Sequence, residues 1–233
     1  MDKKIRDDGA YRNLKYGHFL IYKSNEWMFT HIPKNGGTSF VGYVKRSKAL
    51  MKAKYGLNLL DVGFNRLHNQ PQELKNIFNE IEGCKPVCLT RNPWSRCLSQ
   101  YLFNVESSMR TPNIDQQWSK DVHCRLTREG FKGCWMPGGH FRDNENMQNG
   151  INHNPDRTWR EDDPQYKWIA DDTKWFKLET QLDDFYDFIG LPNPNFVRNT
   201  SKHHDYNLYY DDELRDEIAK LYAKDIEMFD YTF

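Results

Sequence analysis

The hydrophobic and polar positions along the chain predict strands that alternate with helices. Two short apolar runs, His18 to Tyr22 and Trp27 to Ile32, are typical of strands, and the polar, turn-prone residues 23–26 between them favour a hairpin. Further buried strands are expected at Lys85 to Thr90 and Lys174 to Leu178.

Apolar residues at helical spacing predict the elements between the strands. The expected helices cover residues 39–55, 71–83, 179–189 and 214–228, and a further helix begins near Pro93. Gly83 and Gly190 suit the C-terminal ends of two of these helices. From about residue 109 to 172 the pattern dissolves into Gly, Pro, Asn, Asp and scattered Trp, which predicts long variable loops with room for a helix within 111–131.

This order of elements implies an α/β fold with a mainly parallel central sheet and crossover helices. In such sheets, ligands bind at the carboxyl ends of the strands. The 233 residues fit a single domain spanning residues 1–233, which is large enough to bury a core without disulfides or metals.

Charge and composition narrow the classes of partner. Lys plus Arg equals Asp plus Glu at 33 each, so no bulk basic field favours nucleic acid or an anionic membrane. The sequence has no apolar run long enough to cross a bilayer and no signal-peptide pattern at its start, so a soluble, cytoplasmic protein is expected. Five cysteines without CxxC spacing predict free thiols, with Cys124 and Cys134 the pair to check.

The strand that ends at Ile32 runs into the string IPKNGGTSF. Gly36 and Gly37 allow backbone angles closed to other residues, and Thr38 and Ser39 stand where a helix N-cap is expected. A strand, a glycine turn and a helix N-terminus gather unpaired N–H groups at the positive end of the helix dipole. The string therefore predicts an anion-binding loop.

A second strand-to-helix junction reads RNPWSRCLSQY. Arg91 ends the strand, Arg96 lies one turn into the following helix, and Ser99 follows three residues later. Arginine gives bidentate, charge-assisted hydrogen bonds to a phosphate, and serine adds a neutral donor. This junction predicts a second phosphate site at the same sheet edge.

Both junctions resemble the nucleotide-binding motifs of sulfotransferases that use 3′-phosphoadenosine 5′-phosphosulfate (PAPS), above all the carbohydrate-type enzymes. IPKNGGTS differs from their IPKTGGTS only at Asn35, and RNPWSRCLSQY is similar to RNPWDRxxSxY, with Ser95 where Asp is common. KWFKLETQLDDFYDFIGLP resembles the segment before the family's last binding loop. The resemblance covers these three blocks and implies a P-loop-like, three-layer α/β/α domain in which residues 109–172 form the acceptor side.

The resemblance also implies roles for individual residues. Lys34 would stabilise the bridging oxygen and the 5′-phosphate, and Arg91 and Ser99, together with Arg96, would bind the 3′-phosphate. The other implied PAPS-binding positions are Asn35, Gly36, Gly37, Thr38, Ser39, Asn199, Ser201 and Lys202. No metal is expected, because lysine, arginine and the helix dipole supply positive charge and the sequence lacks a clear carboxylate cluster.

A general base completes the expected chemistry. Histidine titrates near neutral pH, and His68 lies between the two motifs, where related enzymes carry a His in segments like HxTxxEL. His31 is expected to be a packed strand residue. The alternatives for the base are His140, His153, His203 and His204 in loop segments, and the carboxylates Glu73 and Glu106, since some family branches use Glu.

The implied activity is metal-independent, in-line transfer of the sulfuryl group of PAPS to a hydroxyl, with a saccharide as the expected acceptor. Aromatic and basic residues in the loops could contact a sugar. They are Trp118, Trp135, Trp159, Trp168, Arg125, Arg128, Arg142, Arg157 and Arg160. Most of the tryptophans are expected instead to pack in a small core under the loops. Eukaryotic carbohydrate-type members usually carry a Golgi membrane anchor. The sequence shows no such segment, so by analogy a bacterial or viral enzyme is expected.

Two other functions remain open from the sequence. A P-loop-like small-molecule kinase would require magnesium and ATP, but Lys34 precedes the glycines instead of following them as in a Walker A loop. A non-catalytic nucleotide-binding module would bind adenosine 3′,5′-bisphosphate without forming a sulfonated product.

Overall fold

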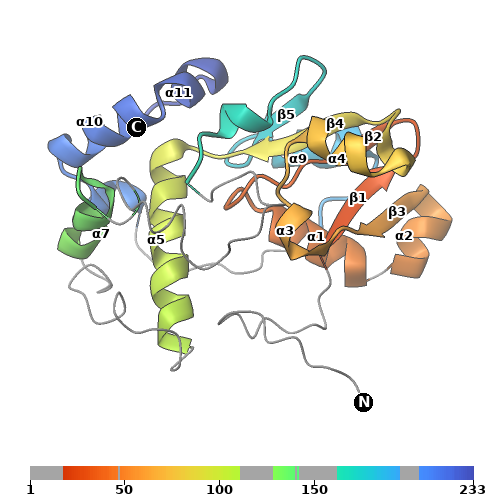
Figure 1. Cartoon of the computed structure of the whole chain (residues 1–233), viewed down its shortest axis with the longest axis horizontal. Coiled ribbons are helices and arrows are strands. Elements are labelled where there is room, and N and C mark those ends of the chain that lie inside the picture. Colours follow the sequence, from red (N-terminus) through yellow and green to blue (C-terminus); the bar gives the residue numbers. More distant parts are fainter. Residues whose placement is uncertain (1–17, 47, 111–127, 140, 142–161, 195–204) are drawn as a thin grey trace.

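The computed structural model describes residues 18–46, 48–110, 128–139, 141, 162–194 and 205–233, which form a mixed α/β structure around a five-stranded sheet (Figure 1). The strands are β1 (Phe19–Lys23), β2 (Trp27–Phe29), β3 (Leu57–Asp61), β4 (Lys85–Thr90) and β5 (Lys174–Lys177). Their order across the sheet is β3-β1-β2-β4-β5.

The sheet is mixed, since β1 runs opposite to the other strands, which share one direction. β2, β4 and β5 are parallel neighbours, whereas β1 is antiparallel to both β2 and β3. The predicted hairpin is confirmed, because Tyr22 pairs with Met28 and Lys23 with Trp27 across the short turn. β3 was not expected, since an edge strand with one buried and three half-buried residues carries a weak hydrophobic pattern.

The helices occupy the predicted regions with several changes of boundary. The α-helices are α1 (Gly37–Arg46), α2 (Lys48–Tyr55), α3 (Gly63–Arg66), α4 (Pro71–Ile77), α5 (Pro93–Arg110), α7 (Arg128–Trp135), α9 (Leu182–Ile189), α10 (Asp212–Leu221) and α11 (Ala223–Phe229). The shorter 3₁₀ helices are η2 (Asn79–Ile81), η4 (Gln165–Trp168) and η5 (Tyr206–Tyr209).

α5 begins at Pro93 and α9 ends before Gly190, as the sequence predicted. Gly190 ends α9 in the left-handed region, with φ 74°. Two other predictions about helix ends were wrong. Gly83 does not end α4, because the extended conformation of Phe78 stops the helix earlier and η2 follows. The closing helix is divided in two at Tyr222, whose φ of −111° is not helical.

Buried side chains on opposite faces of the sheet pack against different helices. α1, α2 and α9 pack on the face that contains Phe29 and Leu89, whereas α4 and η2 pack on the face that contains Met28. A separate core joins α5, α7 and α10, and Figure 1 shows α5 between these helices and the sheet. Within the described residues, no helix combines the length and apolar character that a membrane span requires.

Two of the tryptophans considered for acceptor binding are core residues, as the sequence predicted for most of them. Trp135 packs in the core of α5, α7 and α10, and Trp168 packs beside Cys88. Trp118 and Trp159 lie outside the described residues, as do Arg125, Arg142, Arg157 and Arg160.

The cysteines in the described residues are buried free thiols: Cys84, Cys88, Cys97 and Cys134. Burial raises the pKa of the Cys88 and Cys97 thiols well above the usual range. Cys124 lies outside the described residues, so its pairing with Cys134 stays untested.

Candidate anion-binding site

The loop after β2 and the start of α5 meet at the carboxyl ends of two parallel strands. β2 and β4 are neighbours, and the Thr30 N–H extends their pairing by donating to the Val87 carbonyl at 2.8 Å. Because adjacent parallel strands end at the same edge of a sheet, the two junctions come together there, as the sequence predicted.

The backbone of the loop has the alternating geometry of an anion-binding nest. Lys34 and Gly36 have positive φ of 69° and 80°, and Asn35 between them does not. Such alternation turns successive N–H groups toward one concavity. A lysine in the left-handed region is uncommon and costs about 1 kcal/mol, so surrounding contacts must hold Lys34 there.

The first turn of α1 adds further N–H groups to the loop. α1 begins at Gly37, earlier than the predicted start at Ser39, and the Gly36 carbonyl accepts from the Ser39 N–H at 2.9 Å. Gly36 rather than Thr38 or Ser39 is therefore the N-cap, which corrects the prediction. The N–H groups of Gly37 and Thr38 lie in the first turn, where a helix offers no acceptor, and the Thr38 side chain is exposed.

Asn35 faces the protein interior instead of solvent. Its side chain is 1% exposed, and Nδ2 donates to the Leu89 carbonyl at 2.8 Å and to Oε1 of Gln165 at 2.6 Å. Asn35 thus fastens the loop to β4 and to η4.

The two arginines of the second junction also hold the loop. Arg91 is half-buried and donates from NH1 to the Lys34 carbonyl and from Nε to Oγ of Ser95, both at 3.1 Å. Burial lowers the pKa of the Arg91 guanidinium, the Glu179 carboxylate opposes that shift, and the group stays a cation at neutral pH. Arg96 is 3% exposed and donates from Nε to the Pro33 carbonyl at 3.1 Å. Arg96 is therefore an interior residue that bonds to the backbone of the loop.

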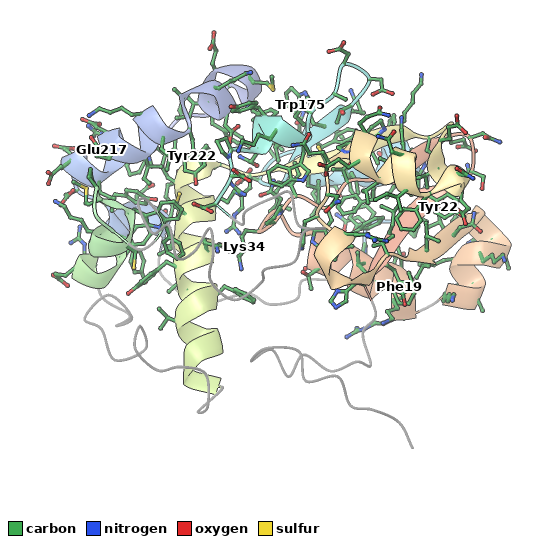
Figure 2. The ribbon with its side chains drawn as sticks, in the orientation of Figure 1. Phe19, Tyr22, Lys34, Trp175, Glu217 and Tyr222 are labelled. Carbon is green, nitrogen blue, oxygen red and sulfur yellow. The ribbon has the colours of Figure 1, made fainter. Side chains whose placement is uncertain are left out.

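One stripe of α5 lies beside the loop. Ser95, Ser99 and Phe103 are four residues apart and half-buried, so they share one helix face. The Nζ atom of Lys34 lies 3.6 Å from the centre of the Phe103 ring, a cation–π contact, and Figure 2 shows Lys34 next to α5. The stripe places Ser99 between the arginine junction and the residue that contacts Lys34.

His31 and His68 lie against the other side of the loop. The centres of their rings are 4.4 Å apart, and a Cβ atom on Gly37 would lie 2.2 Å from Cδ2 of His31. Burial lowers the pKa of His31 well below its usual value, with His68 and His18 adding to the shift, so the ring is neutral. His31 is the packed residue that the sequence predicted, and its ring lies next to both the His68 ring and the backbone of Gly37.

Hydrogen bonding fixes the tautomer of His68. Its Nδ1 lies 2.6 Å from the His31 carbonyl oxygen. A carbonyl has no proton to give, so Nδ1 carries the proton, and in the neutral ring Nε2 is the nitrogen that carries the lone pair. Trp168 donates from Nε1 to the His68 carbonyl at 2.7 Å, which holds the backbone of the same residue.

No family model, curated protein or solved structure matches the chain. The site therefore stands on its own geometry and on the motifs in the sequence. In the part of the chain described, no group of three or more His, Cys, Asp or Glu side chains could hold a metal ion.

Several sequence candidates lie outside the described residues. They include three predicted nucleotide ligands and four alternative bases: Asn199, Ser201, Lys202, His140, His153, His203 and His204. The Glu106 side chain is likewise not described, and Glu73 accepts from the Gln70 N–H at 3.0 Å at the start of α4.

Sequence reasoning missed the side chains that support the site. Gln165 and Asp225 are fully buried, and Phe103 contacts Lys34. No motif marks Gln165, which lies in the stretch expected to form variable loops, or Asp225, which lies in a helix of mixed pattern. Phe103 could have been found from its helical spacing to Ser95 and Ser99.

Proposed function

We propose that the protein is a PAPS-dependent sulfotransferase that transfers a sulfuryl group to a hydroxyl, with a saccharide as the acceptor. The observation that carries the proposal is the meeting of the two sequence motifs, since the Arg91 guanidinium donates to the Lys34 carbonyl at 3.1 Å. The helices on both faces of the sheet are compatible with a P-loop-like, three-layer fold, which forms part of the proposal.

The residues present fit the two ends of the donor nucleotide. The alternating backbone of the loop and the first turn of α1 offer N–H groups for the phosphosulfate, from Gly36, Gly37 and Thr38, whereas the Ser39 N–H donates to the Gly36 carbonyl. Arg91 and Ser99 are assigned to the 3′-phosphate. Arg96 is assigned to the loop instead, because it is almost fully buried against the Pro33 carbonyl.

Sulfuryl transfer requires alignment of the reactants, charge stabilisation on the bridging oxygen, and a base for the acceptor proton. PAPS supplies the activated sulfuryl group. Lys34 neutralises charge on the bridging oxygen as the sulfur–oxygen bond to the leaving phosphate breaks. Nε2 of His68 takes the hydroxyl proton as the acceptor oxygen bonds to sulfur, because Nδ1 is already protonated and bonded to His31.

Calorimetric titration with adenosine 3′,5′-bisphosphate, in the presence of a chelator, tests nucleotide binding. We expect binding in the wild type that Arg91→Ala weakens about tenfold or more, as expected for the loss of a charged hydrogen-bonding partner. Arg215→Ala is the matched control, since Arg215 pairs with Asp212 and Asp216 on the surface of α10. ATP with magnesium is titrated in parallel without the chelator. If the wild type binds neither adenosine 3′,5′-bisphosphate nor ATP, or binds only ATP, the proposal is overturned.

Transfer from PAPS to a panel of saccharides tests the chemistry. Lys34→Ala should abolish transfer, and His68→Ala should slow transfer while the bisphosphate still binds with wild-type affinity. Loss of nucleotide binding in His68→Ala would assign that residue to the structure of the loop and not to proton transfer.

A further inference from the structure

Gln165 links three segments that are far apart in the sequence. Its side chain is fully buried, and its Oε1 accepts from Nδ2 of Asn35 at 2.6 Å and from the Arg91 N–H at 2.8 Å. Its Nε2 donates to the Arg91 carbonyl at 2.8 Å. One amide group therefore bonds to the loop after β2 and to both backbone groups of Arg91, the residue that follows β4.

The same stretch is tied to the loop a second time. Arg96 donates from NH1 to the Asp163 carbonyl at 2.8 Å and from Nε to the Pro33 carbonyl at 3.1 Å. The Arg96 guanidinium thus connects Pro33, at the start of the loop, to Asp163. Asn35–Gln165 and Pro33–Arg96–Asp163 form two parallel connections between the loop and residues 163–165.

A buried carboxylate anchors the far end of these connections. Asp225 in α11 is fully buried, and its oxygens accept from the Gln165 N–H at 2.7 Å and the Tyr166 N–H at 2.8 Å. Burial raises the pKa of the Asp225 carboxyl, while these N–H groups and the Arg96 cation oppose the shift. Asp225 therefore fixes the start of η4, and with it Gln165, to the C-terminal helix.

We infer that Gln165 is a positioning residue that holds the loop at Lys34–Gly36 in its anion-binding conformation. Lys34 is in the unfavourable left-handed region, so the loop depends on contacts outside itself. Asn35 lies between the two residues with positive φ. Its side-chain amide donates two hydrogen bonds, and Gln165 accepts one of them. Removing Gln165 frees the loop to relax and lowers its affinity for anions. The identity of that anion as PAPS rests on the proposed function.

Hydrogen exchange of the ligand-free protein tests the inference without any nucleotide. Gln165→Leu should increase the exchange rate of amides in residues 34–38 by about tenfold, as expected for the loss of a buried hydrogen bond. Gln181→Leu is the matched control, because Gln181 accepts from the Lys177 N–H at 2.9 Å at the β5–α9 turn and none of its bonds reaches the loop. Equal exchange at residues 34–38 in the two variants overturns the inference.

A double-mutant cycle with Asn35→Ala tests whether Gln165 acts through the loop. We expect each single variant to weaken binding of adenosine 3′,5′-bisphosphate about tenfold and the double variant to weaken it no further. Multiplied losses in the double variant contradict the inference. If Gln165→Leu does not fold, Asn35→Ala tests the same hydrogen bond, because it removes the donor on the loop side. Failure of the wild type to bind the bisphosphate would overturn the proposed function, whereas the exchange measurement still decides the role of Gln165.

Discussion

Gly37 is required because the ring of His31 fills the space where a side chain would lie. A Cβ atom there would come within 2.2 Å of Cδ2 and 2.4 Å of Nε2 of His31. We expect Gly37→Ala to lower the free energy of unfolding by about 1–3 kcal/mol, the usual cost of overpacking a core. Urea unfolding measures this loss.

A double variant separates the clash with the His31 ring from a general effect of alanine in α1. In His31→Ala/Gly37→Ala the ring is absent, so the added methyl group has room and the double variant should lose less stability than the sum of the single losses. Strict additivity would show that the clash with His31 is not the reason for the glycine.

The neutrality of His31 predicts a pH dependence of stability. Its pKa in the folded protein is well below 6.5, because the ring is buried and lies next to His68. The unfolded chain therefore binds a proton near pH 6.5 that the folded chain does not, and stability falls as the pH drops below that value. Between pH 6.5 and 5 the loss attributable to His31 is at most about 2 kcal/mol.

His31→Gln removes this titration and keeps a polar side chain. Urea unfolding at pH 7.5, 6.5 and 5 should show a smaller loss of stability in the variant than in the wild type. Parallel losses would mean that His31 binds its proton equally in the folded and unfolded states.

Single residues differ in how far the sequence can assign them. Gly36 and Lys34 were found because a strand followed by glycines and a helix leaves few alternatives for the backbone. Gln165 was missed because its partners Asn35 and Arg91 lie 130 and 74 residues away, so no local pattern reveals them. Supporting residues of this kind are set by tertiary contacts, which spacing along the chain does not encode, whereas Phe103 lies at helical spacing from Ser95 and Ser99.

Among the helices, α5 contributes most directly to the site. Its half-buried stripe ends at Phe103, whose ring lies 3.6 Å from Nζ of Lys34. We expect Phe103→Leu to weaken binding of adenosine 3′,5′-bisphosphate about fivefold, which corresponds to ~1 kcal/mol for a partly exposed cation–π contact. Calorimetric titration measures the change.

Phe19 in β1 provides a matched control for Phe103. Lys45 and Lys48 lie over its ring at 4.7 and 5.8 Å, away from both junctions. Phe19→Leu should leave nucleotide affinity unchanged. A similar loss of affinity in both variants would assign the effect to general destabilisation.

Elements were predicted best where a strong local signal agrees with burial. β4 carries five consecutive buried residues and was predicted at its observed bounds, and α5 begins at its proline. β3 at the sheet edge and the division between α10 and α11 were missed, since each depends on packing against neighbours and not on a turn residue.

Across the molecule, the string RNPW joins the sheet to the C-terminal helices. Arg91 bonds to the loop, whereas Trp94 is buried among α5, α7 and α10 and donates from Nε1 to the Arg215 carbonyl at 3.0 Å. Tyr210 in turn donates from its hydroxyl to the Trp94 carbonyl at 2.9 Å. The sequence revealed the phosphate side of this string but not its second role, because the partners lie more than one hundred residues away.

This division of roles predicts opposite effects for neighbouring substitutions. Trp94→Phe removes the side-chain donor to the Arg215 carbonyl and leaves a small cavity beside it, so the free energy of unfolding should fall by about 1–3 kcal/mol. Affinity for adenosine 3′,5′-bisphosphate should change by no more than about twofold, because the Trp94 side chain bonds to α10 and packs in the helical core, and not against the loop. Arg91→Ala should instead reduce affinity more than stability. Urea unfolding and calorimetric titration of both variants compare the two quantities, and a loss of affinity in Trp94→Phe as large as that in Arg91→Ala would show that the helical core and the anion-binding loop form one coupled unit.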